Sequence, residues 1–457
     1  MGGFPVWFAH FCLPTSTRGN HMVRARGLLV LTTAALVAFA CGGSTGGGAT
    51  KGTIKIGSDL PVCTVGGQST ANGVQFAVNQ KNAAGGVNGY TIAYQSFDDC
   101  RQGAYSADAG VENVQTMLGD SKFLGMIGPY NSAVAKAEIP ISSPQHFVMI
   151  SPSNTNPCLT KEQQPPLPAC SYHAADLRAG NPNNYWRVVT TDDYQGPAMA
   201  LYMYKTLGVT KIGILDDSTV FGVGISGAFE TQFKTLGGTV VKHSEYQKTQ
   251  TSDWKSILLA FKNGGAQGVY VGGTDDQNIC IPRKQMKDLG WDVPFGGGDG
   301  IETTDCIDQA TGNEPGIYST SAGADATQVP GAASAIAAFR QAFPGPNDFG
   351  GYTMQAYDAA NALMAAIGRA INDANGGTPT RDQVRAQMAK TKGFVGVIGT
   401  YDFDPNGDTS LKIVSIYVVQ GKLSADQVKS SSGVCGSKTA KDACFVWKTQ
   451  FDFAKSA

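Results

Sequence analysis

Three residues of this chain have the types and settings that suit recognition of a small charged molecule: Ser132, Thr155 and Asp299. Ser132 and Thr155 each lie in a polar turn that follows an apolar run, and a helix-length segment joins the two runs. This pattern predicts a strand–helix–strand unit whose strands are parallel and buried. Small ligands bind outside the carboxyl ends of such strands. We therefore expect Ser132 and Thr155 to share one rim of a binding site.

Asp299 adds an acidic group to this set. It follows the glycines Gly296–Gly298 at the end of a short predicted strand, where the backbone can approach a ligand closely. Hydroxyl and backbone N–H groups suit a carboxylate, and an acid suits an ammonium group. Together the three residues predict a clamp for the zwitterion of an α-amino acid. Spacing alone is also compatible with Asp299 as a turn residue or a helix N-cap.

Strands and helices alternate along the chain, from the strand predicted at Thr53–Gly57 to the one at Lys412–Val419. This alternation predicts an α/β fold with parallel, doubly wound sheets. Two similar halves with several crossings predict two Rossmann-like lobes around a cleft that opens and closes at a hinge. We expect ligand-binding lobe one at residues 51–191 plus 322–398, and lobe two with the C-terminal tail at residues 192–321 plus 399–457.

Residues 1–50 are expected to direct export rather than to join the fold. From Met22, two arginines precede the apolar segment Gly27–Phe39, and small residues then lead to Cys41. This order is typical of a secretory signal peptide, and a cysteine at the cut resembles a bacterial lipobox, in which the thiol becomes lipidated. The apolar segment is short for a membrane span, although an uncleaved anchor is the alternative. Residues 42–50 predict a flexible tether.

Cysteine usage indicates an oxidising compartment. Apart from Cys12 and Cys41, eight cysteines remain, and they fall into local pairs that predict disulfides. The expected pairs are Cys63 with Cys100, Cys158 with Cys170, Cys280 with Cys306, and Cys435 with Cys444. No C-x₂-C motif or zinc-like spacing occurs, so no metal site is predicted. A net charge of −1 offers no basic footprint for nucleic acid.

The sequence carries few signs of catalysis or of a cofactor. The G-x-S-x-G motif is missing, and the histidines of the mature chain have no obvious Ser or Cys partner. No G-x-G-x-x-G follows the first predicted strand, which weakens dinucleotide binding. Asp402–Gly407 imitates the start of a calcium loop, but the twelfth position is Ile413 rather than Glu. We therefore expect a protein that is not an enzyme and holds no cofactor.

Short motifs occur in a characteristic order along the chain. They are N-x-A-G-G-[IV]-x-G at Asn82–Gly89, F-D-D at Phe97–Asp99, IG…S at Ile127–Ser132, I-S-P-S-x-T at Ile150–Thr155, D-x-Q-G-P at Asp193–Pro197, F-G at Phe221-Gly222, GG at Gly272-Gly273, F-x-G-x-[DE]-G at Phe295–Gly300 and Y-D-F-D-x-x-G-D at Tyr401–Asp408. In this order they resemble the bacterial leucine/isoleucine/valine-binding family, the type I periplasmic binding proteins that serve ABC importers. The resemblance covers Thr53 to about Leu411.

The resemblance implies roles for the clamp residues. Ser132 and Thr155 match positions that bind the ligand carboxylate, and Ser153 and Asn154 match positions that offer backbone and side-chain contacts. Asp299 matches the acid that takes the ammonium group, where branched-chain binders often have Glu. Because Asp is one methylene shorter, we expect the ligand to sit nearer lobe two or to use a water.

The same resemblance implies a changed side-chain pocket. Phe221 and Tyr352 match aromatic positions that line it. Thr274 matches a position where an aromatic residue is common, and Gly66 falls where lobe one usually presents Tyr or Trp. These two losses are expected to widen the pocket and to add polarity. The family's lobe-one disulfide partner is also missing, since Asn131 occupies its place, and the Cys63–Cys100 pair is a candidate substitute.

The expected function follows from the clamp and the resemblance. The protein is expected to be a monomeric, lipid-anchored, extracytoplasmic binding protein that delivers an amino acid to the permease subunits of an ABC importer. Alternatives are an amide, urea or aromatic acid as ligand, or a role as the ligand-sensing subunit of a signalling system. An amide or acid without an ammonium group would not need Asp299.

Overall fold

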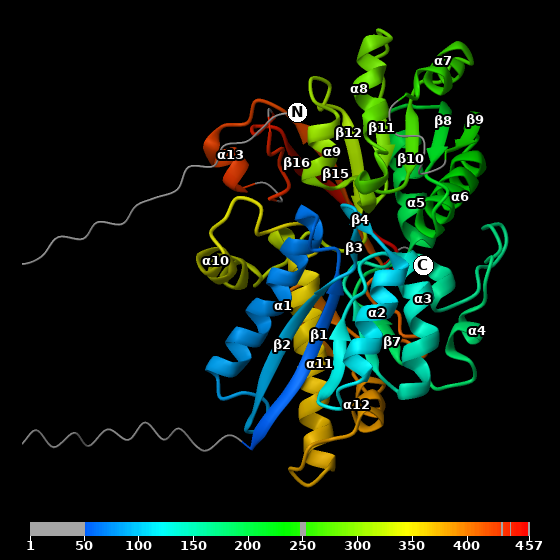
Figure 1. Cartoon of the computed structure of the whole chain (residues 1–457). Helices are drawn as coiled ribbons and strands as arrows, with labels where there is room; N and C mark the ends of the chain where they lie inside the picture. Colours follow the sequence, from blue (N-terminus) through cyan, green and yellow to red (C-terminus); the bar gives the residue numbers. More distant parts are fainter. Residues whose placement is uncertain (1–50, 247–252, 431–432, 439, 456–457) are drawn as a thin grey trace, which may run out of the picture. The chain divides into compact units, whose positions relative to one another are not determined.

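Two β-sheets form the framework of the chain in its computed structural model (Figure 1). The structure describes residues 51–246, 253–430, 433–438 and 440–455. The expected signal peptide, tether and Cys41 lie outside these residues. None of the helices in the described ranges combines the length and apolar composition needed to cross a membrane.

The first sheet is entirely parallel, with the strand order β2-β1-β5-β6-β7. Its strands are β1 (Gly52–Leu60), β2 (Tyr90–Asp98), β5 (Phe123–Ile127), β6 (Val148–Ser151) and β7 (Tyr185–Arg187). Helices α1 (Val65–Ala83), α11 (Thr353–Asp373) and α12 (Arg381–Met388) cover one face, and α2 (Ala107–Leu118) and α3 (Ser132–Ser142) cover the other. Every residue of β5 is buried, because helices pack on both sides of a parallel sheet.

The second sheet has the order β16-β15-β12-β11-β10-β8-β9. Its parallel strands are β8 (Lys211–Asp216), β9 (Thr239–Glu245), β10 (Val269–Gly272), β11 (Phe295–Gly297) and β12 (Ile317–Ser321). Helices α5 (Asp192–Leu201) and α6 (Val220–Thr235) cover one face, and α7 (Lys255–Asn263), α8 (Ile281–Asp288) and α9 (Thr304–Gln309) cover the other. The α/β fold with two lobes is thus confirmed.

The C-terminal tail departs from the parallel arrangement. Strand β15 (Ile413–Gln420) pairs antiparallel with β12, and β16 (Cys444–Asp452) pairs antiparallel with β15. The sequence predicts β15 but not β16. An antiparallel pair can follow a loop directly, whereas a parallel strand would need a crossover back across the sheet. The tail therefore extends the edge of the second sheet.

The remaining elements are short or peripheral. Two small hairpins form from β3 (Cys100–Arg101) with β4 (Ala104–Tyr105) and from β13 (Phe394–Gly396) with β14 (Gly399–Tyr401). The other helices are α4 (Ala174–Arg178), α10 (Ala333–Ala342), α13 (Ala425–Ser430) and a π-helical turn at Tyr202–Thr206. The loop between β1 and α1 is short, because β1 continues to Leu60 and Thr64 caps α1 by accepting a hydrogen bond from the Gly67 amide.

Four disulfides join the local pairs. They are Cys63–Cys100, Cys158–Cys170, Cys280–Cys306 and Cys435–Cys444. The sequence predicts each of these pairs. The last of them lies beside β16 and ties the start of that strand to the preceding loop.

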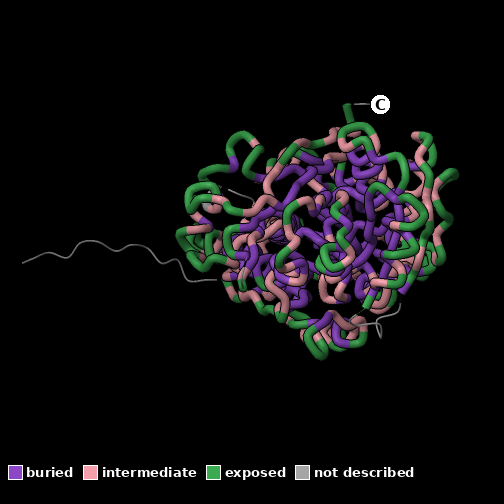
Figure 2. The backbone as a smooth tube through the Cα atoms, turned by 90° about the horizontal axis from the view of Figure 1, so that it is seen from above, coloured by how far each residue is buried: buried purple, intermediate pink, exposed green. Residues whose placement is uncertain are grey.

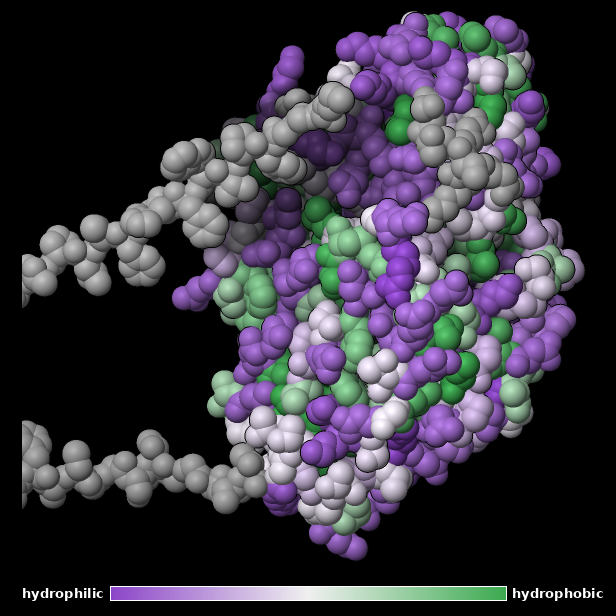
Figure 3. All heavy atoms as spheres, viewed as in Figure 1, coloured by the Kyte–Doolittle hydropathy of each residue, from purple (hydrophilic) through white to green (hydrophobic). Residues whose placement is uncertain are grey.

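The segment after β14 packs with the first sheet. Tyr401 and Phe403 belong to the core formed by α11 and the strands of that sheet, and the buried Arg187 of β7 pairs with Asp408 at 2.6 Å. The lobe boundaries stay a prediction. This packing favours a chain that crosses from lobe one to lobe two for the last time just before β15, rather than at residue 398. Buried residues gather in the interior of the fold, and exposed residues lie mostly at its periphery (Figure 2). Hydrophilic side chains predominate on the face in Figure 3.

Candidate functional site

The first rim of the site is the start of α3. Asn131 is the N-cap of this helix, but its side chain makes no capping hydrogen bond. Within the described part of the chain, the amides of Ser132 and Ala133 have no hydrogen-bond partner either. Ser132 is 3% exposed, and both residues line a cavity at this helix end. Free amides and the positive end of the helix dipole suit a carboxylate.

The second rim is the turn after β6, and Ser151 ties the two turns together. Its hydroxyl donates to the carbonyl oxygen of Pro129 at 2.7 Å and accepts the amides of Ser153 and Asn154 at 3.2 and 2.8 Å. The Ser153 hydroxyl donates to the Tyr130 carbonyl at 2.9 Å. The turns after β5 and β6 therefore form one unit.

Arg187 supports this unit from behind. Its buried guanidinium donates to the carbonyl oxygens of Asn154 and Asn156 at 3.3 and 2.7 Å, and to Asp408. Burial alone would raise the pKa of Asp408, but the charge of Arg187 lowers it below its ordinary value. The pair therefore stays ionised and holds the main chain beside Thr155 in place.

Asp299 follows β11 on the opposite lobe. Its Oδ1 accepts the side-chain amide of Gln195 at 2.7 Å, and its Oδ2 accepts the Tyr352 hydroxyl at 2.6 Å. Burial raises the pKa of Asp299 to about 6, against the opposing effect of these two hydrogen bonds. Both donors are neutral, so the carboxylate has no cationic partner among the described residues. A cationic group of a ligand could therefore pair with this carboxylate.

One cavity brings the two sides together. Its empty space is ≈ 370 Å³, including space open to solvent. The lining contains most of the residues expected from the sequence: Ser132, Ser153, Thr155, Phe221, Thr274 and Asp299. Tyr352 lines the adjoining cavity on the other side of Asp299. The structure thus places hydroxyls and amides of one lobe opposite an acid of the other.

Asn154 is arranged differently from the expectation. Its side chain is buried, with Nδ2 donating to the Tyr130 carbonyl at 2.6 Å and Oδ1 accepting the Tyr185 hydroxyl at 2.7 Å. It does not line the cavity that contains Ser132. Both polar ends of this amide are used inside lobe one, so the side chain supports the turn.

Tyr130 compensates for the small residue at position 66. A Cβ placed on Gly66 would lie 3.3 Å from the Tyr130 hydroxyl. Tyr130 also packs edge-on against Tyr352, with ring centroids 5.8 Å apart. The space expected to be open is therefore partly filled by an aromatic ring from the turn after β5.

Among the cleft residues that sequence reasoning missed are Tyr105, Tyr130, Gln195 and Glu302. Tyr105 and Tyr130 line the cavity with Ser132, and Glu302 lines the cavity with Tyr352. Gln195 holds Asp299 and accepts the Thr320 hydroxyl at 2.6 Å. The D-x-Q-G-P motif contains Gln195, but nothing local in it points to an acid that lies 104 residues further along the chain.

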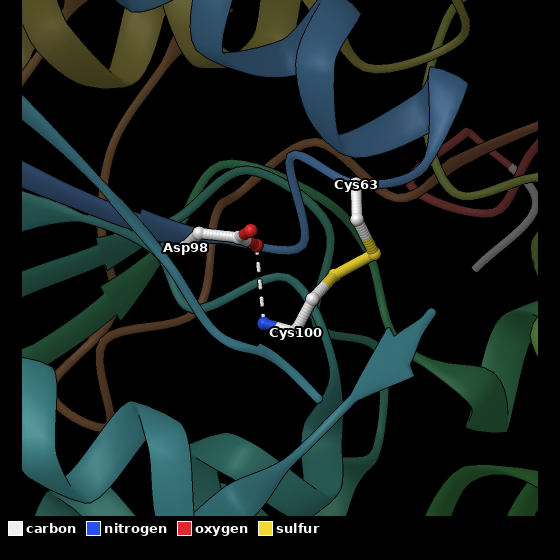
Figure 4. Close-up of side chains that lie close together, drawn as sticks. All are labelled: Cys63, Asp98 and Cys100. Carbon is white, nitrogen blue, oxygen red and sulfur yellow. Dashed lines mark hydrogen bonds between the residues drawn. A yellow bond between two sulfur atoms is a disulfide. The ribbon is translucent and has the colours of Figure 1, made fainter. Parts of the chain in front are cut away.

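A group of possible metal ligands lies near the cleft: Cys63, Asp98 and Cys100 (Figure 4). The two sulfurs form a disulfide, and an Asp98 oxygen accepts the Cys100 amide at 3.1 Å. A disulfide has no thiolate to offer a metal ion. This cluster acts as a covalent tie between the loop after β1 and the start of β3.

Several hydrogen bonds cross the cleft. Tyr352 reaches Asp299, the Asn156 side chain donates to the Val220 carbonyl at 2.9 Å, and the Tyr105 amide donates to Asp276 at 3.3 Å. The first lies at the cavity and the other two lie at its margins. The two lobes are therefore in direct contact around the site.

Two α/β lobes that enclose a polar cleft define a solute-binding protein. The chain belongs to the periplasmic binding protein family, whose profile matches residues 54–427. It is 29% identical to Leu/Ile/Val-binding protein homolog 2 of Brucella abortus over 80% of this chain and 90% of that protein.

Solved structures share the fold. The leucine binding protein LivK of Thermotoga maritima is 22% identical, with a TM-score of 0.70, over 87% of this chain and 99% of that one. A solute-binding protein of R. palustris in complex with 4-hydroxybenzoate is 17% identical, with a TM-score of 0.67, over 88% and 97% of the two chains. The periplasmic binding protein family expected from the motifs is confirmed by the profile match.

Proposed function

We propose that this protein captures an α-amino acid in the interlobe cleft and delivers it to an ABC importer. One observation carries the proposal: Asp299, buried and paired only with neutral donors, faces the uncapped start of α3 across one cavity. An α-ammonium group fits Asp299, and an α-carboxylate fits the start of α3. Leu/Ile/Val-binding relatives support this ligand class.

Binding of the ammonium group by Asp299 gives the first prediction. Titration calorimetry with leucine should show that Asp299→Asn weakens binding by about 2–5 kcal/mol, because the charge partner is lost while the size of the side chain is kept. The matched ligand 4-methylpentanoate, which is leucine without its ammonium group, should bind the native protein weakly. Thermal unfolding of Asp299→Asn in the absence of ligand checks that the variant is folded.

An aromatic acid is the second candidate ligand, since the R. palustris neighbour was crystallised with 4-hydroxybenzoate. The cavity with Tyr130 and Tyr352 could accept a ring. An acid of this kind would bind with equal affinity to the native protein and to Asp299→Asn, and that result would refute the amino-acid clamp.

Export and anchoring complete the proposal. We place the protein outside the cytoplasmic membrane as a monomer held by a lipid on Cys41, with the permease subunits of the importer as its partners. The family and the four disulfides support the compartment. Mass spectrometry of the N-terminal peptide, from protein purified out of its own membranes, tests whether Cys41 is acylated. An importer role, rather than a sensor role, predicts ligand uptake that depends on this protein.

A further inference from the structure

A second cavity adjoins the clamp on the far side of Asp299. Asp299, Glu302, Tyr130 and Tyr352 contribute to its lining. Glu302 follows the short turn that begins at Asp299 and is 7% exposed. Its Oε1 is buried and has no hydrogen-bond partner within the described residues. Burying a carboxyl oxygen without a hydrogen-bond partner costs free energy, unless a ligand supplies that partner.

The charges around this cavity have one sign. Burial raises the pKa of Glu302 well above its ordinary range, and the charges of Asp325 and Asp299 raise it further. Asp275 and Asp276 line the adjoining space beside Thr274. Among the described residues that line these cavities there is no lysine, arginine or histidine. The cleft therefore gathers several acidic groups and no basic one, and a cation that enters it would favour their ionised forms.

The acids beside Thr274 already have protein partners. Asp276 accepts the Tyr105 amide and the Gln277 side chain at 3.3 and 3.1 Å, and Asp275 accepts the Asp276 amide at 3.0 Å. Glu302 also has one partner, since its carboxyl group forms a hydrogen bond with the Ser321 side chain, but its buried Oε1 has none among the described residues. The rings of Tyr130 and Tyr352 line the same cavity, and aromatic faces attract cations.

We propose that the ligand is an α-amino acid with a second positive charge on its side chain, and that Glu302 binds this side-chain cation. The inference rests on the proposed function, because Asp299 and the start of α3 are needed to hold the α-amino and α-carboxylate groups. The side chain then passes Tyr130 and Tyr352 to reach Glu302. The chemical class is that of arginine, lysine and ornithine.

Calorimetry with matched ligands tests the proposal on the full chain. Lysine and norleucine have the same carbon skeleton, and only lysine carries the side-chain ammonium group. At least one of arginine, lysine and ornithine should bind at least about tenfold tighter than norleucine, which corresponds to about 1.4 kcal/mol. Glu302→Gln should remove this preference and leave norleucine affinity unchanged. A cation favours the ionised form of Glu302, so binding of a basic amino acid to the native protein should release a proton. The measured binding enthalpy should then depend on the ionisation enthalpy of the buffer.

Each outcome is decisive. Norleucine binding as tightly as all three basic amino acids would overturn the side-chain assignment but leave the amino-acid clamp standing. Failure of every α-amino acid to bind would overturn both. Loss of the preference in Asp276→Asn, with the preference kept in Glu302→Gln, would show that the cation lies beside Thr274 instead. The unfolding temperature of each variant without ligand shows whether it is folded.

Discussion

At the scale of single residues, the central feature is a carboxylate held by neutral groups. Asp299 has both oxygens engaged by Gln195 and Tyr352, and neither donor supplies a charge. Its pKa of about 6 means that it is mostly ionised at neutral pH and mostly protonated at pH 5. Asp192, which shares Gln195 with it, has a pKa raised well above its ordinary value, first by burial and then by Asp299.

Amino-acid affinity should therefore depend on pH. An ammonium group binds the ionised form of Asp299, so protons compete with the ligand as the pH falls through about 6. With a free-protein pKa of about 6, the Kd for leucine should rise about tenfold between pH 7 and pH 5. Calorimetry at pH 5, 6, 7 and 8 measures this. Asp299→Asn is the control, and an equal pH dependence in that variant would assign the titration to another group.

At the scale of elements, the site depends on how two turns are joined. Ser151 ends β6 and connects the turn after β5 with the turn that carries Ser153 and Thr155. Arg187 of β7 fixes the same main chain from the other side. The positions of the ligand-facing groups are thus set by neighbouring strands of one sheet.

Removing the Ser151 hydroxyl should loosen this connection. Ser151→Ala leaves two buried amides and one carbonyl without their partner, so the free energy of unfolding should fall by about 1–3 kcal/mol, with weaker amino-acid binding. Urea denaturation measures the first effect.

Ser319→Ala is the matched control for this change. Ser319 is fully buried in β12, and its Oγ has no hydrogen-bond partner among the described residues. Its replacement should be neutral or slightly stabilising. Equal losses in the two variants would contradict the role given to Ser151.

At the scale of the whole molecule, many acids are buried in the folded state. The pKa is raised by burial to about 7 for Asp275 and to about 6 for Asp217 and Asp358. His243 acts in the same direction: burial opposes its protonation, but hydrogen bonds with Asp216 and Glu230 raise its pKa. Each of these groups binds protons more tightly when folded.

Stability without ligand should therefore rise as the pH is lowered from 8 to about 5. The folded protein holds protons that the unfolded chain, with acid pKa values near 4, has released, so stability falls as pH rises through 6 to 7. Below about pH 4 the trend should reverse, because the lowered pKa of Asp408 makes its pairing with Arg187 a contribution that is lost on protonation. Scanning calorimetry from pH 3.5 to 8 measures the unfolding temperature. A maximum at pH 8 would contradict this account.

The sequence was most informative where local pattern determines structure. Apolar runs predicted the strands that precede Ser132 and Thr155, and the three glycines before Asp299 marked a close approach of backbone to the cleft. Contacts between distant segments were not predictable in this way. Two such contacts are those of Tyr130 with the space beside Gly66 and of Asn154 with Tyr185. Both depend on neighbours that only the folded sheets bring together. Strand β16 was missed because its role is to pair with β15 at an edge.

The hydrogen bonds that cross the cleft also bear on how long a ligand stays. Opening of the lobes separates Tyr352 from Asp299, Asn156 from Val220 and Tyr105 from Asp276, along with other contacts between the lobes. These bonds belong to the protein, so they slow departure for every ligand alike and do not distinguish one ligand from another. Residence time is then governed by the opening of the lobes, whereas selectivity is governed by the cavity. A permease that pulls the lobes apart would shorten that time without altering which solute is chosen.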